Sequence, residues 1–527
     1  MAKQIIRNAI AAALVALGLL LASAGCAGAQ TREQRTDRYL KSIIHSRRKL
    51  SAFVNRMPKG ADLHVHITGA VYAESFVKWA AAASSPRLCI DSNSLTIVPE
   101  TAENSCVDPA RPPAREALAN SELRNRSIDA WSMRHWKESG ENGHDHFFRT
   151  FGKFSAAIHG HFGDMLAEVA ARSARENLSY LELMLTPDND ISSGLGRNLK
   201  WTGDLPAMRD ELLPQIGKAV EAGKETLDEA ETKERELLNC GSAKADPGCK
   251  VAVKFIFQIG RTNPPSVAFA QMVAAMEMAK ADHRLVALNL VAPEDAKSSL
   301  DNFDGQMKML DYLHSVYPAV HITLHAGELT PAFVAEDALK SHIRDSIEIA
   351  HAERIGHGVD VMHEQDSEGL LKEMAERKIL VEICLTSNDL ILNVTGKNHP
   401  LHTYIKFGVP VALATDDQGV ARSDIDGEYL RAIEDQTLTY SRLKQMARAS
   451  LEYSFAEGAS LWKSRDTFVP VDQCAKDFGA AAKQRRPLRQ ASAACRVFLD
   501  GSQKATLEWN LEQRFRQFES GITAKPL

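Results

Sequence analysis

Two histidines separated by one residue begin the part of the sequence that could do chemistry. His64 and His66 stand at the end of an apolar run, Asp62–Ile67, of the kind that forms a β-strand. Side chains two residues apart on a strand point to the same side, so both imidazoles would face one interior. Neutral imidazoles placed in this way suit zinc, iron or nickel.

Polar side chains also follow three later apolar runs. His325 and Glu328 lie in the segment HAGE, His357 lies in RIGHG, and Asp416 and Asp417 lie in ATDDQ. If these runs are parallel strands of one barrel, their carboxyl ends meet on a single face. The sequence therefore predicts that side chains from four strand ends converge.

The residue types in this set predict a metal site with a place for water. Three imidazoles and one carboxylate can hold a divalent metal, which lowers the pKa of a coordinated water. A nitrogen and oxygen ligand set does not distinguish zinc from iron. The predicted ligands are His64, His66, His325 and Asp416.

The remaining polar residues suit acid–base work and substrate binding. Glu328 could protonate a ring nitrogen or a leaving group, because it lies just past the strand that carries His325. His357 could orient the attacking oxygen or act as a base, and Asp417 could bind the substrate.

Eight short apolar runs alternate with helical stretches along the chain. Near-continuous apolar strands suit a parallel sheet that helices cover, which predicts a (β/α)8 TIM barrel, with a doubly wound sheet as the weaker alternative. The strands are predicted at Asp62–Ile67, Leu178–Leu185, Val251–Ile259, Leu285–Ala292, His321–His325, Arg354–Gly358, Leu380–Thr386 and Val409–Thr415. Helices are predicted at Asp164–Glu176, Leu205–Leu238, Ser266–Ala281, Gly305–Ser315, Ala332–Ala350 and Gln503–Glu519.

Three polar stretches that interrupt this alternation each contain two cysteines. We interpret residues 57–463 as one barrel domain. The first two polar stretches, at about 83–126 and 192–250, are surface insertions of this domain, and the third lies in a C-terminal segment at 464–527. Six cysteines allow fifteen pairings, but their proximity favours three local disulfides. The pairs are Cys89 with Cys106, Cys240 with Cys249, and Cys474 with Cys495. Cys384, in the apolar run LVEICLTS, is predicted to be a buried free thiol.

The first 29 residues have the layout of a secretory signal peptide, followed by a helical segment at 30–56. Lys3 and Arg7 precede an apolar stretch and then small residues. Cleavage after Ala29 would release a soluble protein, whereas the lipobox-like sequence ending at Cys26 would leave an acylated cysteine. Both alternatives predict export to the bacterial periplasm or cell envelope.

Composition narrows the class of protein. The chain has 527 residues and a mass of 58.0 kDa, with 44% hydrophobic and 25% charged residues, which excludes a largely disordered or fibrous chain. Its formal net charge of -5 provides no global basic field, so no nucleic-acid partner is expected. No later apolar run is long enough to span a membrane.

Several ordered segments resemble the adenosine deaminase family of metal-dependent hydrolases. They run from Met57 to about Trp462 and include MPKGADLHVHITGA, HITLHAGE, RIGHGVD, EICLTSND and HPLHTYIKFGVPVALATDDQGV. The leader, the helix before MPKG and the cysteine-bearing insertions look more like the secreted, growth-factor-related subgroup.

This resemblance implies one Zn2+ on the four predicted ligands and a purine nucleoside as substrate. Glu328 would donate a proton to purine N1, His357 would position the hydroxide, and Asp417 would bond N7. Attack at C6 of adenosine or 2′-deoxyadenosine would then give inosine or its deoxy form and ammonia.

Two positions depart from the family pattern and leave the nucleoside preference open. Ala292 stands where the family has a glycine whose N–H reaches purine N3. Thr68 stands where an acidic residue commonly contacts the ribose 5′-hydroxyl.

Other functions fit the sequence less well. A related barrel metallohydrolase acting on another purine, an amide or a cyclic substrate would share the metal ligands. Cytidine-type deaminases need H-x-E and a later P-C-x-x-C, but no C-x-x-C occurs here. A purely binding role predicts a lost ligand or acid, yet all are present, although the polar insertions could mediate a homodimer.

Overall fold

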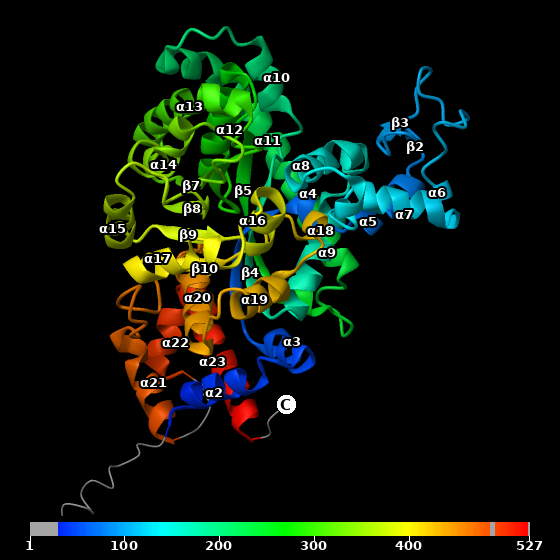
Figure 1. The fold of residues 1–527 in the computed structure, drawn as a ribbon. Helices are drawn as coiled ribbons and strands as arrows, with labels where there is room; N and C mark the ends of the chain where they lie inside the picture. The colour runs from blue at the N-terminus through cyan, green and yellow to red at the C-terminus, as the bar shows by residue number, and fades with distance from the viewer. Residues whose placement is uncertain (1–29, 485–490, 525–527) are drawn as a thin grey trace, which may run out of the picture.

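A closed barrel of eight parallel strands forms the centre of the molecule (Figure 1). The computed structural model describes residues 30–484 and 491–524. The strands are hydrogen-bonded in the order β1, β4, β5, β6, β7, β8, β9, β10, all in parallel. The barrel closes because Asp416, after β10, donates its N–H to the carbonyl of His64 at 2.9 Å. Their bounds are β1 Gly60–His66, β4 Leu178–Leu185, β5 Ala252–Gly260, β6 Leu285–Val291, β7 His321–Ala326, β8 Arg354–His357, β9 Leu380–Ile383 and β10 Val411–Leu413.

Helices connect the strands and cover the outside of the barrel. The long helix α11 packs against α9 and α12, so most of the predicted insertion at 192–250 belongs to this helical layer. The helices that precede or follow the strands are α9 Phe162–Arg175, α10 Ile191–Asn198, α11 Leu205–Leu237, α12 Pro265–Ala281, α13 Lys297–Val316, α14 His342–Glu348, α15 Ser367–Arg377, α16 Leu385–Leu392, α17 Leu401–Phe407, α18 Gln418–Ala421, α19 Ile425–Glu434 and α20 Tyr440–Glu452.

The predicted TIM barrel is confirmed, and the main error concerns one helix. Residues Ala332–Ala350 were expected to form a single helix, but they contain a short 3-10 turn, Glu336–Leu339, and the seven-residue α14. Residues 327–335, between β7 and this turn, contain turns and irregular backbone, which apolar periodicity does not reveal. The β10 strand is also shorter than the predicted run Val409–Thr415.

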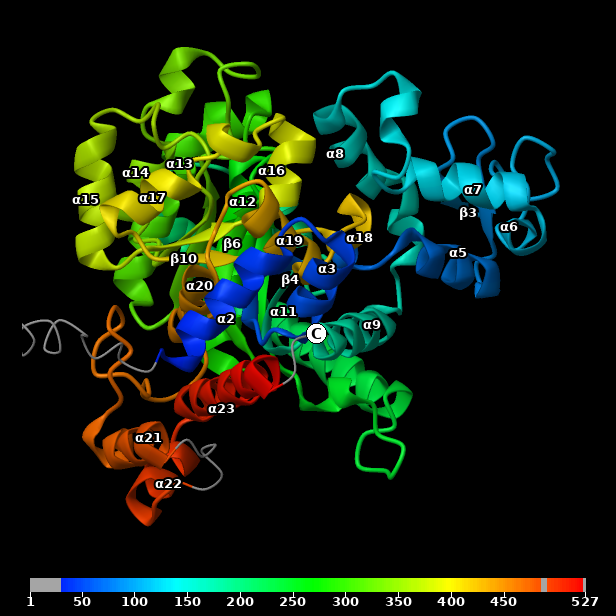
Figure 2. The ribbon, with the colours of Figure 1, turned by 60° about the horizontal axis from the view of Figure 1, so that its bottom comes forward.

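The part of the chain that connects β1 to β4 forms a lobe beside the barrel (Figures 1 and 2). It contains a two-stranded antiparallel hairpin, which the first cysteine pair ties to the following loop. Its elements are α4 Ile67–Ala70, α5 Ala73–Ala82, β2 Leu88–Ile90, β3 Ile97–Pro99, α6 Glu116–Ala119, α7 Ser121–Ala130 and α8 Gly143–Phe154.

All three predicted local disulfides form, and Cys384 is a buried free cysteine. Their Cα–Cα distances are 5.4 Å for Cys89–Cys106, 5.6 Å for Cys240–Cys249 and 4.7 Å for Cys474–Cys495. The predicted leader with Cys26 lies outside the described residues. Among the described residues, no helix is both long and apolar enough to cross a membrane.

Helices from both ends of the chain pack together below the barrel (Figure 1). Phe53, Tyr440 and Phe518 from three of these helices form edge-to-face and tilted ring contacts. The third disulfide links α21 to α22 within a small separate apolar cluster. The bounds are α2 Arg32–Ile43, α3 Arg47–Arg56, α21 Asp472–Gln484, α22 Ala493–Asp500 and α23 Gln503–Ala524.

A buried arginine lies inside the barrel between two carboxylates. Arg354 on β8 donates to Glu382 at 2.7 Å and to Glu182 at 2.5 Å, and its third nitrogen donates to the carbonyl of Tyr453 at 3.0 Å. All three charged side chains are at most 1% exposed. Removing the guanidinium would leave two buried carboxylates without their positive partner.

We therefore predict that Arg354→Met lowers the free energy of unfolding by about 3–5 kcal/mol, the cost of breaking a buried pair. Chemical denaturation of the purified protein measures this change. The control is Arg422→Met, which removes an ion pair with the exposed Glu74 and should cost less than about 1 kcal/mol. Equal losses in the two variants would contradict the prediction.

Candidate active site

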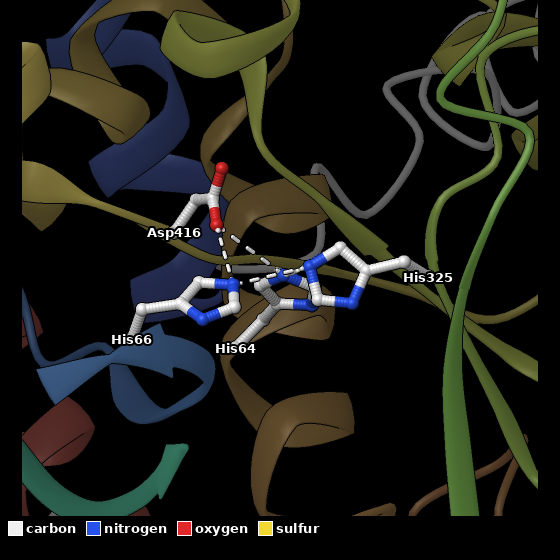
Figure 3. Close-up of side chains that lie close together, drawn as sticks. All are labelled: His64, His66, His325 and Asp416. Carbon is white, nitrogen blue, oxygen red and sulfur yellow. Dashed lines mark hydrogen bonds and ion pairs between the residues drawn. The ribbon is translucent and has the colours of Figure 1, made fainter. Parts of the chain in front are cut away.

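Three imidazoles and one carboxylate converge at the carboxyl ends of the strands (Figure 3). His64 and His66 come from β1 and His325 from β7, while Asp416 follows β10. One potential ligand atom of each lies within 4.8 Å of all the others. The Nε2 atom of His325 is 3.0 Å from that of His64 and 3.1 Å from that of His66. Asp416 Oδ1 is 3.4 Å from His64 Nε2 and 3.3 Å from His66 Nε2.

These separations fit a metal shell. Ligand atoms about 2.0–2.1 Å from a tetrahedral zinc lie about 3.3 Å apart, close to the observed spacing. Three nitrogens and one carboxylate oxygen are also a donor set that zinc accepts, and a fifth position can take water. The residues present therefore fit a divalent metal.

Each imidazole of the cluster has its remote nitrogen next to an oxygen acceptor. An Nδ1–H that donates to such an oxygen leaves the Nε2 lone pair free for a metal, which fixes the ring orientation. The distances are 2.6 Å for His64 Nδ1 to Glu382 Oε2, 3.2 Å for His66 Nδ1 to Gln258 Oε1, and 2.9 Å for His325 Nδ1 to Asn289 Oδ1. The hydroxyl of Ser387 likewise donates to Asp416 Oδ2 at 2.7 Å.

The predicted acid, Glu328, lies beside this cluster with a free oxygen. Its Oε1 atom is buried and has no hydrogen-bond partner among the described residues. Burial, followed by the charges of Asp416 and Glu294, raises the pKa of Glu328 well above its usual range. A protonated carboxyl at this position can donate a hydrogen bond to a ligand.

Glu294, after β6, holds the turn that carries Glu328. Its carboxylate accepts the backbone N–H of Glu328 at 2.8 Å, that of Gly327 at 3.2 Å and His342 Nδ1–H at 2.7 Å. Burial alone would raise the pKa of Glu294, but the bond from His342 and the charge of Arg261 lower it to about 2. This buried anion fixes the position of Glu328 relative to the end of β6.

His357 and Asp417 complete the set of polar atoms at the strand ends. His357 Nε2 and Asp417 Oδ1 are buried and have no hydrogen-bond partner among the described residues. Burial lowers the pKa of His357 to about 3, and burial followed by the charge of Asp416 raises the pKa of Asp417 well above its usual range. The Asp417 side chain lies close to the backbone of Gly69, and only glycine leaves room for it there: a Cβ on residue 69 would lie 1.5 Å from Asp417 Oδ1.

The two positions that depart from the family pattern lie just after the strands β6 and β1. Ala292 directly follows β6 and has a φ of 85°, in the region that favours glycine. Thr68 lies half-buried in the short helix α4, which begins at Ile67 directly after His66. The structure thus retains a glycine-like backbone at Ala292 despite the added methyl group.

The side chains at the strand ends were predicted from the sequence, whereas those that orient them were not. Glu382, Gln258, Asn289 and Glu294 were not predicted to belong to the site. The first three are polar residues that interrupt apolar strand runs, and this interruption is the signal that could have identified them. Glu294 lies in a loop and has no comparable signal.

The sequence also matches known proteins. The sequence model of the adenosine deaminase family matches residues 132–464, and the chain therefore belongs to this family. His64 and His66 precede the matched residues.

Individual relatives align over part of the chain. An adenosine deaminase from Yersinia pseudotuberculosis is 30% identical over 190 residues, which cover 35% of this chain and about half, 54%, of that protein. An adenine deaminase from Sinorhizobium fredii is 27% identical over 312 residues, or 59% of this chain and 77% of that protein. Among solved structures, Arabidopsis ADAL in complex with GMP is similar with a TM-score of 0.51 and 18% identity, over 83% of this chain and 99% of that chain.

We predict that Glu382→Gln weakens metal binding about 10–100-fold, as is usual when a partner of a ligating histidine is changed. The amide keeps the shape of the side chain but lacks the charge that His64 Nδ1–H faces. Zinc titration against a competing chelator measures the affinity. Glu512→Gln, which changes a buried carboxylate paired with Arg448 on α20, is the control and should bind zinc like wild type. Unchanged affinity in Glu382→Gln would contradict the prediction.

Proposed function

We propose that the protein is an exported, zinc-dependent adenosine deaminase that converts adenosine, and 2′-deoxyadenosine, to inosine or its deoxy form and ammonia. The observation that supports this most directly is the cluster of His64, His66, His325 and Asp416 with the free polar atoms of Glu328, His357 and Asp417 around it. Membership of the adenosine deaminase family agrees with the same chemistry.

Each residue then has a role that follows from its protonation and position. A metal on the four ligands would lower the pKa of a water molecule. The water oxygen bonds to C6 while Glu328, protonated by its raised pKa, donates its proton to N1. Asp417, also protonated, donates to N7, and His357 orients the attacking oxygen. One proton of the water returns to Glu328 and the other goes to the amino group as the C6–N bond breaks, so ammonia leaves and C6 becomes a carbonyl.

The substrate preference has a second candidate. The adenine deaminase from Sinorhizobium fredii aligns over 77% of its length, and Thr68 offers no carboxylate to a ribose hydroxyl. The alternative substrate for a deaminase with this site is therefore adenine, a purine that carries no sugar. A barrel metallohydrolase acting on an amide or another cyclic substrate is the more distant one.

Export is the second part of the proposal. Three disulfides among the described residues suit an oxidising compartment, such as the periplasm or cell envelope. The proposed domain division follows the sequence: a leader at 1–29, helices at 30–56, the barrel at 57–463 and the disulfide-bonded C-terminal segment. Lipid attachment at Cys26 and a homodimer remain proposals from the sequence.

We predict that the metal-loaded protein converts adenosine to inosine and that Glu328→Gln lowers kcat by about 100–10,000-fold, the usual contribution of a general acid. Because the protonated form donates, kcat should fall as the pH rises through the raised pKa of Glu328. Ultraviolet assays with adenosine, 2′-deoxyadenosine and adenine measure both effects.

The controls are a chelated sample, which should be inactive until zinc is restored, and Glu368→Gln on the exposed surface of α15, which should behave like wild type. A metal-loaded wild type that leaves adenosine and 2′-deoxyadenosine unchanged would overturn the proposal. Conversion of adenine alone would favour the second candidate.

We also predict that Ala292→Gly lowers KM for adenosine by about 3–10-fold, because removing the methyl group restores the approach of one hydrogen bond to purine N3. The φ of 85° already suits glycine at this position. Steady-state kinetics measure KM, and 3-deazaadenosine, which lacks N3, is the control substrate. An equal gain with 3-deazaadenosine would contradict this role of Ala292.

A further inference from the structure

A chain of buried hydrogen bonds ends at Nδ1 of His357. The backbone N–H of Leu401 donates to His399 Nδ1 at 3.1 Å. His399 Nε2 lies 3.0 Å from Asn388 Oδ1, and the side-chain nitrogen of Asn388 lies 3.0 Å from His357 Nδ1. The chain joins the start of α17 and α16 to the end of β8.

The direction of every bond in this chain follows from its first donor. A backbone N–H can only donate, so His399 Nδ1 accepts and the proton of His399 is on Nε2. His399 Nε2–H then donates to Asn388 Oδ1, which turns the amide nitrogen toward His357. An amide nitrogen also only donates, so His357 Nδ1 accepts and the proton of His357 is on Nε2.

Burial protects this arrangement from water. His357 and Asn388 are fully buried, and His399 is 3% exposed. Burial also lowers the pKa of His399 to about 4, so the ring is neutral and keeps a single proton. Glu328 Oε1 is 3.7 Å from His357 Nδ1, beyond hydrogen-bond distance, and does not compete with Asn388.

The other nitrogen of His357 is free for a ligand. Its Nε2 is buried and has no hydrogen-bond partner among the described residues. The same ring lies beside His64 and His325, with centroids 4.9 Å and 5.1 Å away. A proton fixed on Nε2 makes this nitrogen a donor toward the cluster and prevents it from accepting a proton there.

We propose that Asn388 and His399 are positioning residues that hold His357 in the Nε2–H form, so that His357 orients the attacking oxygen as a hydrogen-bond donor and does not act as its base. This inference rests on the proposed deaminase function for its role in the reaction. The direction of the hydrogen bonds rests on the structure alone.

The first test reads the proton position directly. In zinc-loaded protein labelled with 15N-histidine, His357 should show a protonated Nε2 and an unprotonated Nδ1, and the signals are assigned by their loss in His357→Gln. Protonation at Nδ1 would overturn the proposal whatever the activity of the enzyme.

The second test measures what this series of hydrogen bonds contributes to turnover. His399→Leu removes the donor that orients Asn388 and should lower kcat by about 10–100-fold, the range found when an outer-shell partner of an active-site histidine is changed. KM should stay near the wild-type value, because His357 acts on the attacking oxygen and not on the purine. His399→Gln keeps an amide donor and should recover part of the activity.

The control is His402→Leu on α17, three residues after His399, which removes a histidine bonded to the carbonyl of Gln436 and lies outside the hydrogen-bond chain. If the wild type deaminates adenosine while His399→Leu and His402→Leu turn over equally, the positioning role is overturned. If the wild type deaminates no purine, the proposed function fails, and the 15N spectrum still decides the proton position.

Discussion

One buried carboxylate connects the stability of the barrel to the geometry of its site. Glu382 accepts a hydrogen bond from Arg354 at 2.7 Å through one oxygen and faces His64 Nδ1 at 2.6 Å through the other. Without Arg354 the charge of Glu382 would be too costly to bury, and without Glu382 the His64 ring would lose the partner that directs Nε2 toward the cluster. The core of the barrel therefore contains charges because the site above it needs an oriented imidazole.

The sequence predicted the strands well, because their burial leaves a continuous apolar signal. Leu178–Leu185 was predicted with its exact bounds, since both faces of this strand are covered. The segment Ala332–Ala350 was wrongly predicted as one helix, because the non-helical Ser341 separates the 3-10 turn from α14. The period of apolar residues indicates which face of a regular helix or strand is buried, and this segment does not form one regular element.

The same difference applies to the site. The side chains at the strand ends could be predicted, because parallel strands bring their carboxyl ends to one face of the barrel. The partners of the histidines could not, because they depend on which residue of a neighbouring strand lies alongside. Glu382 is opposite Gly356, where the absence of a side chain leaves room for the His64 ring, and only the assembled register shows this.

Barrel closure and ligand placement are one event in this chain. Asp416 closes the barrel through both of its backbone groups: its N–H donates to the carbonyl of His64, and its carbonyl accepts the N–H of His66. Its side chain, held by Ser387, lies against the imidazoles of those two residues. A barrel that closed in another register would place a different residue beside the histidines. The ligand set is therefore also a test of register, since only the native closure assembles it.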